Sequence, residues 1–185
     1  MKTIIVYYSF TGNNEALVQE LKERLGCDTV RIQTVKKRTS ASILLDLIFK
    51  RSPKLKEYNI PFSDHPHLIL IAPVWAGNIA TPMQAFLKNE KRNILNYSFI
   101  TLCGGVAGQK EKISEYLKSI LLSKPTAIEE LWVNDLLLPE QKDKIKFTTP
   151  YRVKEEDWKV FNPKIDAFIN AVTVSTAGSV PVGIR

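Results

Sequence analysis

A polar loop between a strand-like run and a helix-like run is the feature that most constrains the fold of this 185-residue chain. The apolar run at residues 3–8 is rich in β-branched and aromatic side chains, which is typical of a buried strand. Apolar residues then recur at helical spacing over 15–25, which predicts an amphipathic helix. The loop Ser9-Phe10-Thr11-Gly12-Asn13-Asn14 therefore lies at the carboxyl end of a strand and at the start of a helix.

This loop has the composition of a phosphate-binding cup. The first N–H groups of a helix lack backbone partners and carry a partial positive charge. Ser9, Thr11, Asn13 and Asn14 add short polar side chains, and Gly12 allows close approach of the backbone. The loop has no Lys or Arg, and no Gly-Lys-Ser/Thr triplet occurs in the chain, which argues against a Walker-type triphosphate site. The alternative without a ligand is an ordinary helix N-cap at Thr11 or Asn13.

Strand-like and helix-like segments alternate along the rest of the chain, which predicts a parallel sheet with helices on both faces. Further strands are expected at 28–33, 68–72, 97–103 and 128–133. Further helices are expected at 81–91, 109–122 and 155–172, with a short amphipathic helix around Ile43, Leu44, Leu47 and Ile48. We expect one domain over residues 1–174, with a longer connection at 134–150, and a tail at 175–185 that is either flexible or docked on a partner.

Two more segments with ligand-binding character follow the third and fourth predicted strands. Pro73-Val74-Trp75-Ala76-Gly77-Asn78 combines a flat aromatic face with small residues and backbone amides, which suits a broad planar ligand. Cys103-Gly104-Gly105-Val106-Ala107-Gly108 is a glycine-rich strand-to-helix turn. In a doubly wound sheet all three segments meet beyond the carboxyl ends of the strands. A core aromatic and plain turns are the alternative explanation.

These three segments resemble the binding loops of flavodoxins and related FMN proteins. The family's first loop is Ser/Thr-x-Thr-Gly-Asn-Thr, which this chain matches except that Asn14 replaces the last threonine. The second segment is similar to the family's Pro-x-Trp/Tyr-x-Gly. The resemblance covers about residues 1–172, without a clear counterpart for 36–62. It implies an α/β fold with a flavodoxin-like doubly wound five-stranded parallel sheet of order 2-1-3-4-5. It also implies FMN as cofactor, bound by Ser9, Phe10, Thr11, Gly12, Asn13, Asn14, Pro73, Val74, Trp75, Ala76, Gly77, Asn78, Cys103, Gly104, Gly105 and Gly108.

The resemblance implies a redox role in which the flavin carries the chemistry and no side chain acts as a nucleophile. A flavodoxin-like electron carrier that docks on a redox partner protein is one expectation. An FMN-dependent oxidoreductase that passes electrons from NAD(P)H to a quinone or another small acceptor is a second. A flavin-free binding module on the same fold is a third.

Charge bears on the choice of partner. The net charge is +7, and residues 36–56 hold seven Lys or Arg against the single acid Asp46. This departs from the acidic character of typical flavodoxins and favours acidic or anionic partners, including the phosphates of NAD(P)H. A zinc-finger spacing or RNP signature is absent, so no specific nucleic-acid partner is predicted. A solvated basic face is the simplest explanation of the charge.

Other sequence features argue against several classes of protein. No apolar run approaches the roughly 20 residues of a transmembrane helix, and no signal-peptide pattern is seen, so the cytoplasm is the expected compartment. Cys27 and Cys103 are isolated, and Cys103 is expected to be a small buried residue. His65 and His67 lack further ligands, so they are expected in a loop and no metal site is predicted. No hydrolase elbow accompanies Ser9.

Overall fold

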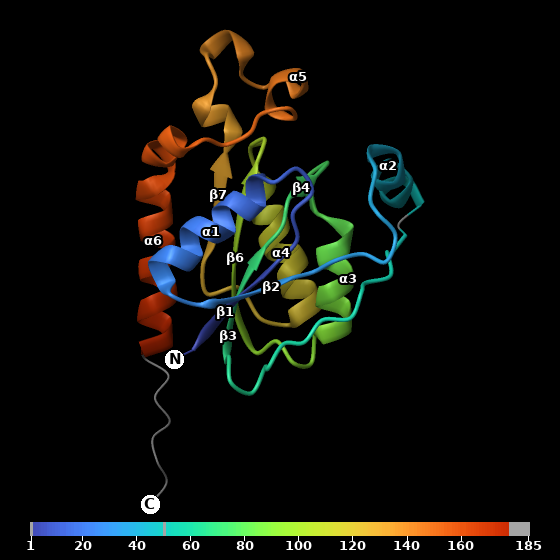
Figure 1. Ribbon diagram of the computed structural model, residues 1–185, viewed down its shortest axis with the longest axis vertical. Helices are drawn as coiled ribbons and strands as arrows, with labels where there is room; N and C mark the ends of the chain where they lie inside the picture. Colours follow the sequence, from blue (N-terminus) through green and yellow to red (C-terminus); the bar gives the residue numbers. More distant parts are fainter. Residues whose placement is uncertain (1, 50, 178–185) are drawn as a thin grey trace, which may run out of the picture.

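Five parallel strands form the central sheet of the computed structural model, which describes residues 2–49 and 51–177. Their order, β2-β1-β3-β6-β7, is the predicted 2-1-3-4-5 once the two strands of a separate hairpin are set aside (Figure 1). The flavodoxin-like fold class is therefore confirmed. The sheet strands are β1 (Thr3–Tyr7), β2 (Asp28–Arg31), β3 (His67–Ile71), β6 (Asn96–Cys103) and β7 (Ile128–Trp132). The hairpin strands are β4 (Val74–Trp75) and β5 (Asn78–Ile79).

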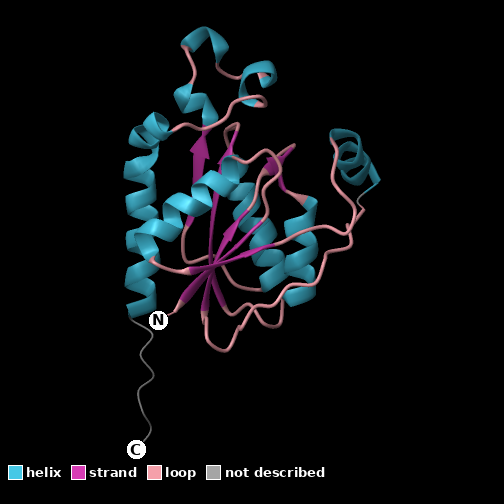
Figure 2. Cartoon of the chain, in the orientation of Figure 1, coloured by secondary structure: helices cyan, strands magenta, loops and turns pink. Residues whose placement is uncertain are grey.

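Helices cover both faces of the sheet, as Figure 2 shows. The helices are α1 (Asn13–Leu25), α2 (Ser40–Phe49), α3 (Thr81–Glu90), α4 (Gln109–Leu121), α5 (Ile145–Thr148) and α6 (Trp158–Ala177). Successive side chains of β1 point to opposite faces. Ile4 and Val6 pack in one core with α3 and α4, whereas Ile5 and Tyr7 pack in a second core with α1 and α6. Because helices bury both faces of the sheet, a ligand can reach it at the edges. The loops that follow the carboxyl ends of the strands lie at one of these edges.

The structure departs from the predicted elements mainly in two places. The longer connection predicted at 134–150 holds the short 3₁₀ helices Val133–Leu136 and Pro139–Gln141 and the single turn α5. The acidic residues Glu155–Asp157 form a 3₁₀ turn of their own, so α6 starts at Trp158 and continues past the predicted end to Ala177. Most of the predicted tail lies outside the described residues, and the domain boundary at 174 stays a prediction.

His67 lies within β3 and not in the preceding loop, where the sequence pattern put it. Its imidazole is buried, and its Nε2 is 3.0 Å from the hydroxyl oxygen of Ser98 on β6. Burial favours the neutral ring and lowers the pKa of His67 to about 4. His67 is therefore a neutral core residue at ordinary pH.

A helix that crosses a bilayer must be long and apolar. No helix within the described residues, 2–49 and 51–177, has both the length and the apolar character that crossing a membrane requires.

Candidate functional site

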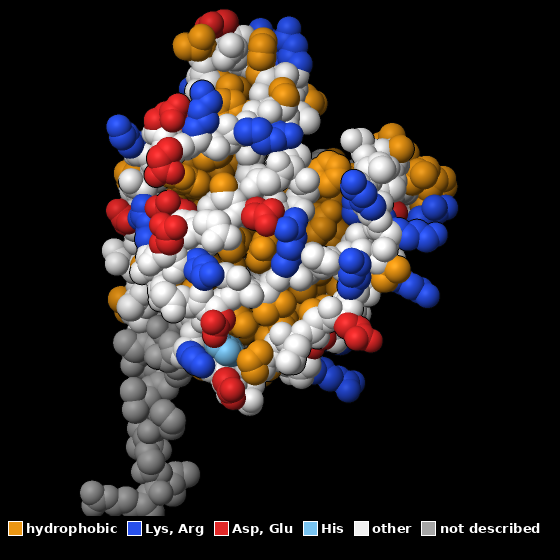
Figure 3. All heavy atoms as spheres, viewed as in Figure 1, with side chains coloured by type: hydrophobic (Ala, Val, Ile, Leu, Met, Phe, Trp, Pro, Cys, Tyr) orange, Lys and Arg blue, Asp and Glu red, His pale blue; other side chains and the backbone are white. Residues whose placement is uncertain are grey.

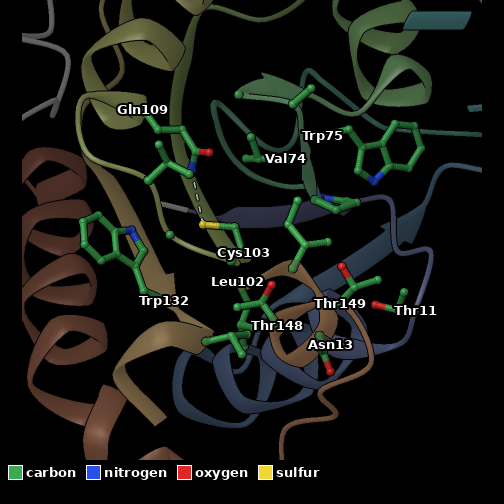
Figure 4. A pocket seen from close by; sticks show the side chains of 18 of the residues that line it. Thr11, Asn13, Val74, Trp75, Leu102, Cys103, Gln109, Trp132, Thr148 and Thr149 are labelled. Atoms are coloured by element: carbon green, nitrogen blue, oxygen red, sulfur yellow. Dashed lines mark hydrogen bonds between the residues drawn. The ribbon is translucent and has the colours of Figure 1, made fainter. Parts of the chain in front are cut away.

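The three predicted loops enclose one cavity of about 880 Å³ at the carboxyl edge of the sheet (Figure 4). This confirms that segments far apart in the sequence meet at the edge where β1, β3 and β6 end. The predicted residues that line the cavity are Phe10, Thr11, Asn13, Asn14, Pro73, Val74, Trp75, Ala76, Gly77, Cys103, Gly104 and Gly105. Four predicted residues, Ser9, Gly12, Asn78 and Gly108, lie in the same loops but outside its lining.

The start of α1 presents unpaired backbone donors. Gly12 has a φ of 97°, a left-handed conformation that glycine adopts without strain, and it caps the helix. The Ser9 hydroxyl accepts the N–H of Glu15 at 3.2 Å, and the Gly12 carbonyl accepts the N–H of Ala16 at 2.9 Å. Within the part of the chain that the structure describes, the N–H groups of residues 11–14 have no hydrogen-bond acceptor. The loop therefore has the donors that an anion requires.

The side chains of Asn13 and Asn14 join this loop to the rest of the fold. The Asn13 amide donates to the carbonyl of Tyr151 at 2.9 Å and accepts the N–H of Val153 at 3.1 Å. The Asn14 amide donates to the carbonyl of Leu102 and accepts the N–H of the same residue, both at 3.0 Å. The sequence suggested these amides as ligand donors, but both are engaged with backbone. Among the described residues, the donors of this loop without an acceptor are the backbone N–H groups of 11–14 and the hydroxyls of Ser9 and Thr11.

The second segment is a tight hairpin. Ala76 and Gly77 join β4 to β5 with φ values of 49° and 72°, which is the pattern of a type I′ turn. The Asn78 amide donates to the Ala76 carbonyl at 2.9 Å, so this side chain holds the turn. Trp75 packs edge-on against both Tyr8 and Phe10, with ring centroids 6.0 Å apart in each pair. These contacts fix the half-buried indole at the wall of the cavity beside the first loop.

The glycine-rich third loop lies against Trp132, at the end of β7. Gly105 has a φ of 90°, and a Cβ there would lie 2.5 Å from Cγ of the Trp132 indole. The indole N–H donates to one oxygen of the buried Glu130 carboxylate at 3.2 Å, and the Gln109 amide donates to the other at 2.5 Å. Figure 4 shows Trp75 and Trp132 well separated across the cavity.

Cys103 lies between these walls and is buried, as predicted. Burial raises the pKa of its thiol to about 12, and the nearby Glu130 carboxylate adds to the rise. The Gln109 amide lies 3.3 Å from its sulfur. The group is therefore a neutral thiol at ordinary pH and a wall of the cavity, not a nucleophile.

Two regions that the sequence did not indicate as part of the site also line the cavity. Ser40, Ile43 and Leu44 come from α2. The segment after β7 contributes Val133, Asn134, Asp143, Ile145, Thr148 and Thr149. The apolar spacing of 43–48 revealed the helix but not its position, because nothing local specifies where a peripheral helix docks.

Asn134 fixes the second of these regions. Its N–H donates to the Gly104 carbonyl at 3.3 Å, and its side-chain amide donates to Asp143 at 2.9 Å while accepting the N–H of that residue at 3.0 Å. Asp143 is the one charged side chain among the described lining residues. The cavity is therefore nearly neutral, and its polar side chains come mostly from the head of α1 and from the segment after β7.

The fold and the position of the cavity define the class: an α/β protein of flavodoxin-like architecture whose site lies at the switch point between β1 and β3. Neither the family models nor the curated proteins match the sequence.

Solved structures do match the fold. An FMN-complexed flavoprotein from Lactobacillus acidophilus NCFM is 16% identical, covers 70% of this chain and 92% of its own, and superposes with a TM-score of 0.61. Its apo form is 18% identical, covers 70% of this chain and 91% of its own, and gives 0.55. A proposed flavoprotein from Bacteroides eggerthii DSM 20697 is 16% identical, covers 91% of this chain and 98% of its own, and gives 0.63. At such identities these likenesses establish the fold.

Proposed function

We propose that this protein binds FMN in the cavity and uses it for electron transfer. The proposal depends on two features that lie side by side. The free N–H groups at the head of α1 open onto the same apolar cavity that Trp75 lines. A phosphate at the helix N-terminus and a flat aromatic ring in the cavity are the two halves of a flavin mononucleotide.

The chemistry of the donors fits this cofactor. Thr11 offers a hydroxyl, and Gly12 leaves the approach to the helix start open, with no atom within 4 Å of a Cβ placed there. Among the residues that the structure describes, no Lys or Arg lines the cavity, which suits a single phosphate held by neutral donors without a metal ion. Val74, Trp75, Leu102 and Cys103 give the cavity apolar walls, which suit an isoalloxazine ring. Bound FMN would supply the redox chemistry, and the chain would bind, orient and shield it.

Flavin titration tests the proposal directly. We expect the purified protein to bind FMN with the visible spectrum of a bound flavin, and to bind riboflavin at least about tenfold more weakly because riboflavin lacks the phosphate. Thr11→Val should weaken FMN binding and leave riboflavin binding unchanged. Thr126→Val, at an exposed position outside the cavity lining, is the matched control. Equal affinity for the two flavins would contradict the phosphate site, and no binding of either would favour the flavin-free module.

A second candidate function is supported by the outer walls of the cavity. Ile43 and Leu44 from α2 and Ile145 from α5 extend the apolar lining away from the head of α1. Such a cavity suits a small apolar electron acceptor next to the flavin, as an NAD(P)H:quinone-type oxidoreductase requires.

Kinetics separate the two candidates. Steady-state oxidation of NADPH by the FMN-loaded protein in the presence of a quinone would favour the oxidoreductase. Negligible turnover, together with rapid reduction by a flavin reductase protein, would favour the electron carrier.

A further inference from the structure

The outer side of α2 is an exposed apolar surface. Leu44, Leu45, Ile48 and Phe49 are 58%, 44%, 62% and 59% exposed, although each is a large hydrophobic residue. At about 100° per residue these four positions fall within one arc of the helix. A cluster of this kind on one element marks an interaction surface, unlike isolated apolar residues elsewhere on a protein. We call these four residues the α2 apolar face.

The opposite side of α2 anchors the helix to the domain. The buried Asp46 carboxylate pairs with the guanidinium of Arg38 and accepts the hydroxyl of Thr81 on α3 at 3.4 Å. Arg38 also donates to the carbonyl of Ser42 at 3.2 Å, and Ile43 is buried. Because the inner side is used in this way, the apolar face is held outward, where α2 stands at the edge of the domain (Figure 1).

Exposed cations flank α2 along the chain, and the Arg51 guanidinium lies 5.0 Å from the centre of the Phe49 ring. These cations come from the segments that enter and leave the helix: Lys36, Lys37, Arg51, Lys54 and Lys56. The N–H of Val35 donates to the carbonyl of Lys54 at 2.9 Å, which holds the two segments side by side. Figure 3 shows Lys and Arg side chains beside the apolar cluster over α2. Among the described residues none of these five cations forms an ion pair, and the acid of this region, Asp46, is already paired inside.

We propose that the α2 apolar face docks on the surface of a membrane that contains anionic lipid. A short helix with Leu, Ile and Phe on one side and lysines beside it matches the interfacial helices of peripheral proteins. The apolar side chains enter the boundary between headgroups and acyl chains, and each nearby cation adds attraction to anionic headgroups.

Other occupants fit the same surface less well. Lysine is depleted in protein–protein interfaces, whereas it is the main cation beside this face. A second copy of the chain related by two-fold symmetry would bring the same cations opposite one another. An anionic bilayer satisfies both the apolar residues and the charge.

Docking also has a consequence for the cavity. Leu44 belongs both to the α2 apolar face and to the cavity lining. A docked α2 would therefore place the cavity close to the lipid, from which an apolar acceptor could enter. This consequence rests on the proposed function, but the docking itself does not.

Vesicle co-sedimentation with the full chain, with and without added FMN, tests the docking. We expect binding to phosphatidylcholine vesicles that contain about one-third phosphatidylserine, little binding to pure phosphatidylcholine, and weaker binding as salt rises. The triple variant Leu45→Gln, Ile48→Gln, Phe49→Gln should lower partitioning at least about tenfold. The matched control is Leu95→Gln, Leu122→Gln, Val174→Gln, which changes exposed apolar residues elsewhere and should bind like the wild type.

Variants that remove lysines test the contribution of charge to vesicle binding. Lys36→Gln, Lys37→Gln, Lys54→Gln should weaken binding to the anionic vesicles, whereas Lys22→Gln, Lys118→Gln, Lys124→Gln should change it little. Retention on heparin-agarose should fall in the first charge variant but not in the apolar variant, since heparin offers charge without an apolar phase. An unchanged melting temperature in the apolar variant would exclude misfolding as the cause of lost binding.

Three results would overturn the proposal. The first is failure of the wild-type protein to bind the anionic vesicles. The second is vesicle binding that the apolar variant retains in full, because attraction would then be charge alone. The third is a wild-type dimer that the apolar variant converts to a monomer, which would assign the face to a second copy. Loss of FMN binding with vesicle binding intact would reject the proposed function and leave the docking standing.

Discussion

The side-chain amide of Asn14 pairs with both backbone groups of Leu102, donating to its carbonyl and accepting from its N–H at 3.0 Å each. The pairing of β6 with β3 ends at Ile100, and β6 stays paired with β7 as far as Cys103. The Asn14 side chain therefore supplies partners to Leu102 where β3 no longer does. The interaction is buried and joins positions 88 residues apart. It fixes the start of α1 relative to the strand that leads into the glycine-rich loop.

Replacing Asn14 with alanine tests this joint. Two buried backbone groups would lose their partners, so Asn14→Ala should lower the free energy of unfolding by about 2–4 kcal/mol. Urea denaturation measures the change. Asn170→Ala, at an exposed position on α6, is a matched control that should change stability by less than about 0.5 kcal/mol. A loss as small as that of the control would show that the pairing contributes little.

Trp75→Ala should weaken FMN binding at least about tenfold, because the variant removes an aromatic wall worth on the order of 1 kcal/mol beyond its buried area. Quenching of flavin fluorescence during titration gives the affinity. Trp75→Phe should retain more of the affinity than Trp75→Ala, since it keeps an aromatic face. Unchanged affinity in the alanine variant would remove Trp75 from the site.

Gly105→Ala should disrupt the glycine-rich loop, whereas Gly104→Ala should be tolerated. An alanine at position 105 would have to adopt a φ of 90°, and its Cβ would lie 2.5 Å from the Trp132 ring. A Cβ at Gly104 would meet no atom closer than 3.7 Å. We expect a loss of about 2–4 kcal/mol for the first variant and less than about 1 kcal/mol for the second. Thermal unfolding of both variants provides the comparison. Equal stability would contradict the close packing of Trp132.

The fold could be predicted because its signals are local. The β-branched runs at 3–8 and 68–72 define buried strands on their own, and the polar loop at 9–14 specifies a strand-to-helix turn. Once strands and helices are known to alternate, few strand orders remain, because connections between parallel strands are right-handed and do not cross one another. The position of the three loops at one edge then follows from the parallel direction of the strands.

The remainder of the site depends on contacts that no local pattern encodes. Asn134 organises the segment up to Asp143 by hydrogen bonds between residues nine positions apart, within a stretch without regular periodicity. The docking of α2 involves the buried Asp46, which contacts Arg38 and Thr81, and the buried Ile43. Asn13 and Asn14 have side chains suited to binding a ligand, and only the tertiary structure reveals that backbone groups of distant segments already occupy them.

The ion pair between Arg38 and Asp46 should be essential for the position of α2. Both side chains are about nine-tenths buried, so Asp46→Ala leaves a buried guanidinium without its partner, at a cost of about 3–5 kcal/mol. The double variant Arg38→Met, Asp46→Leu should recover much of this loss, because it removes both charges. Urea denaturation of the two variants gives the comparison. A double variant as unstable as Asp46→Ala would show that packing at these positions matters more than the unpaired charge.

His67 should make the fold sensitive to mild acid. Its pKa is lowered from the ordinary 6.5 to about 4 by burial, so the unfolded chain takes up a proton at a higher pH than the folded protein. The contribution of His67 to stability is therefore complete above pH 6.5 and is lost as the pH falls from there toward 4, amounting to about 2 kcal/mol between pH 7 and pH 5. His67→Gln removes this titration while keeping a nitrogen near the Ser98 hydroxyl. The wild type should lose more of its unfolding free energy than His67→Gln when urea titrations at pH 7 and pH 5 are compared. Identical losses in the two proteins would mean that the imidazole is protonated as readily in the folded state as in the unfolded one.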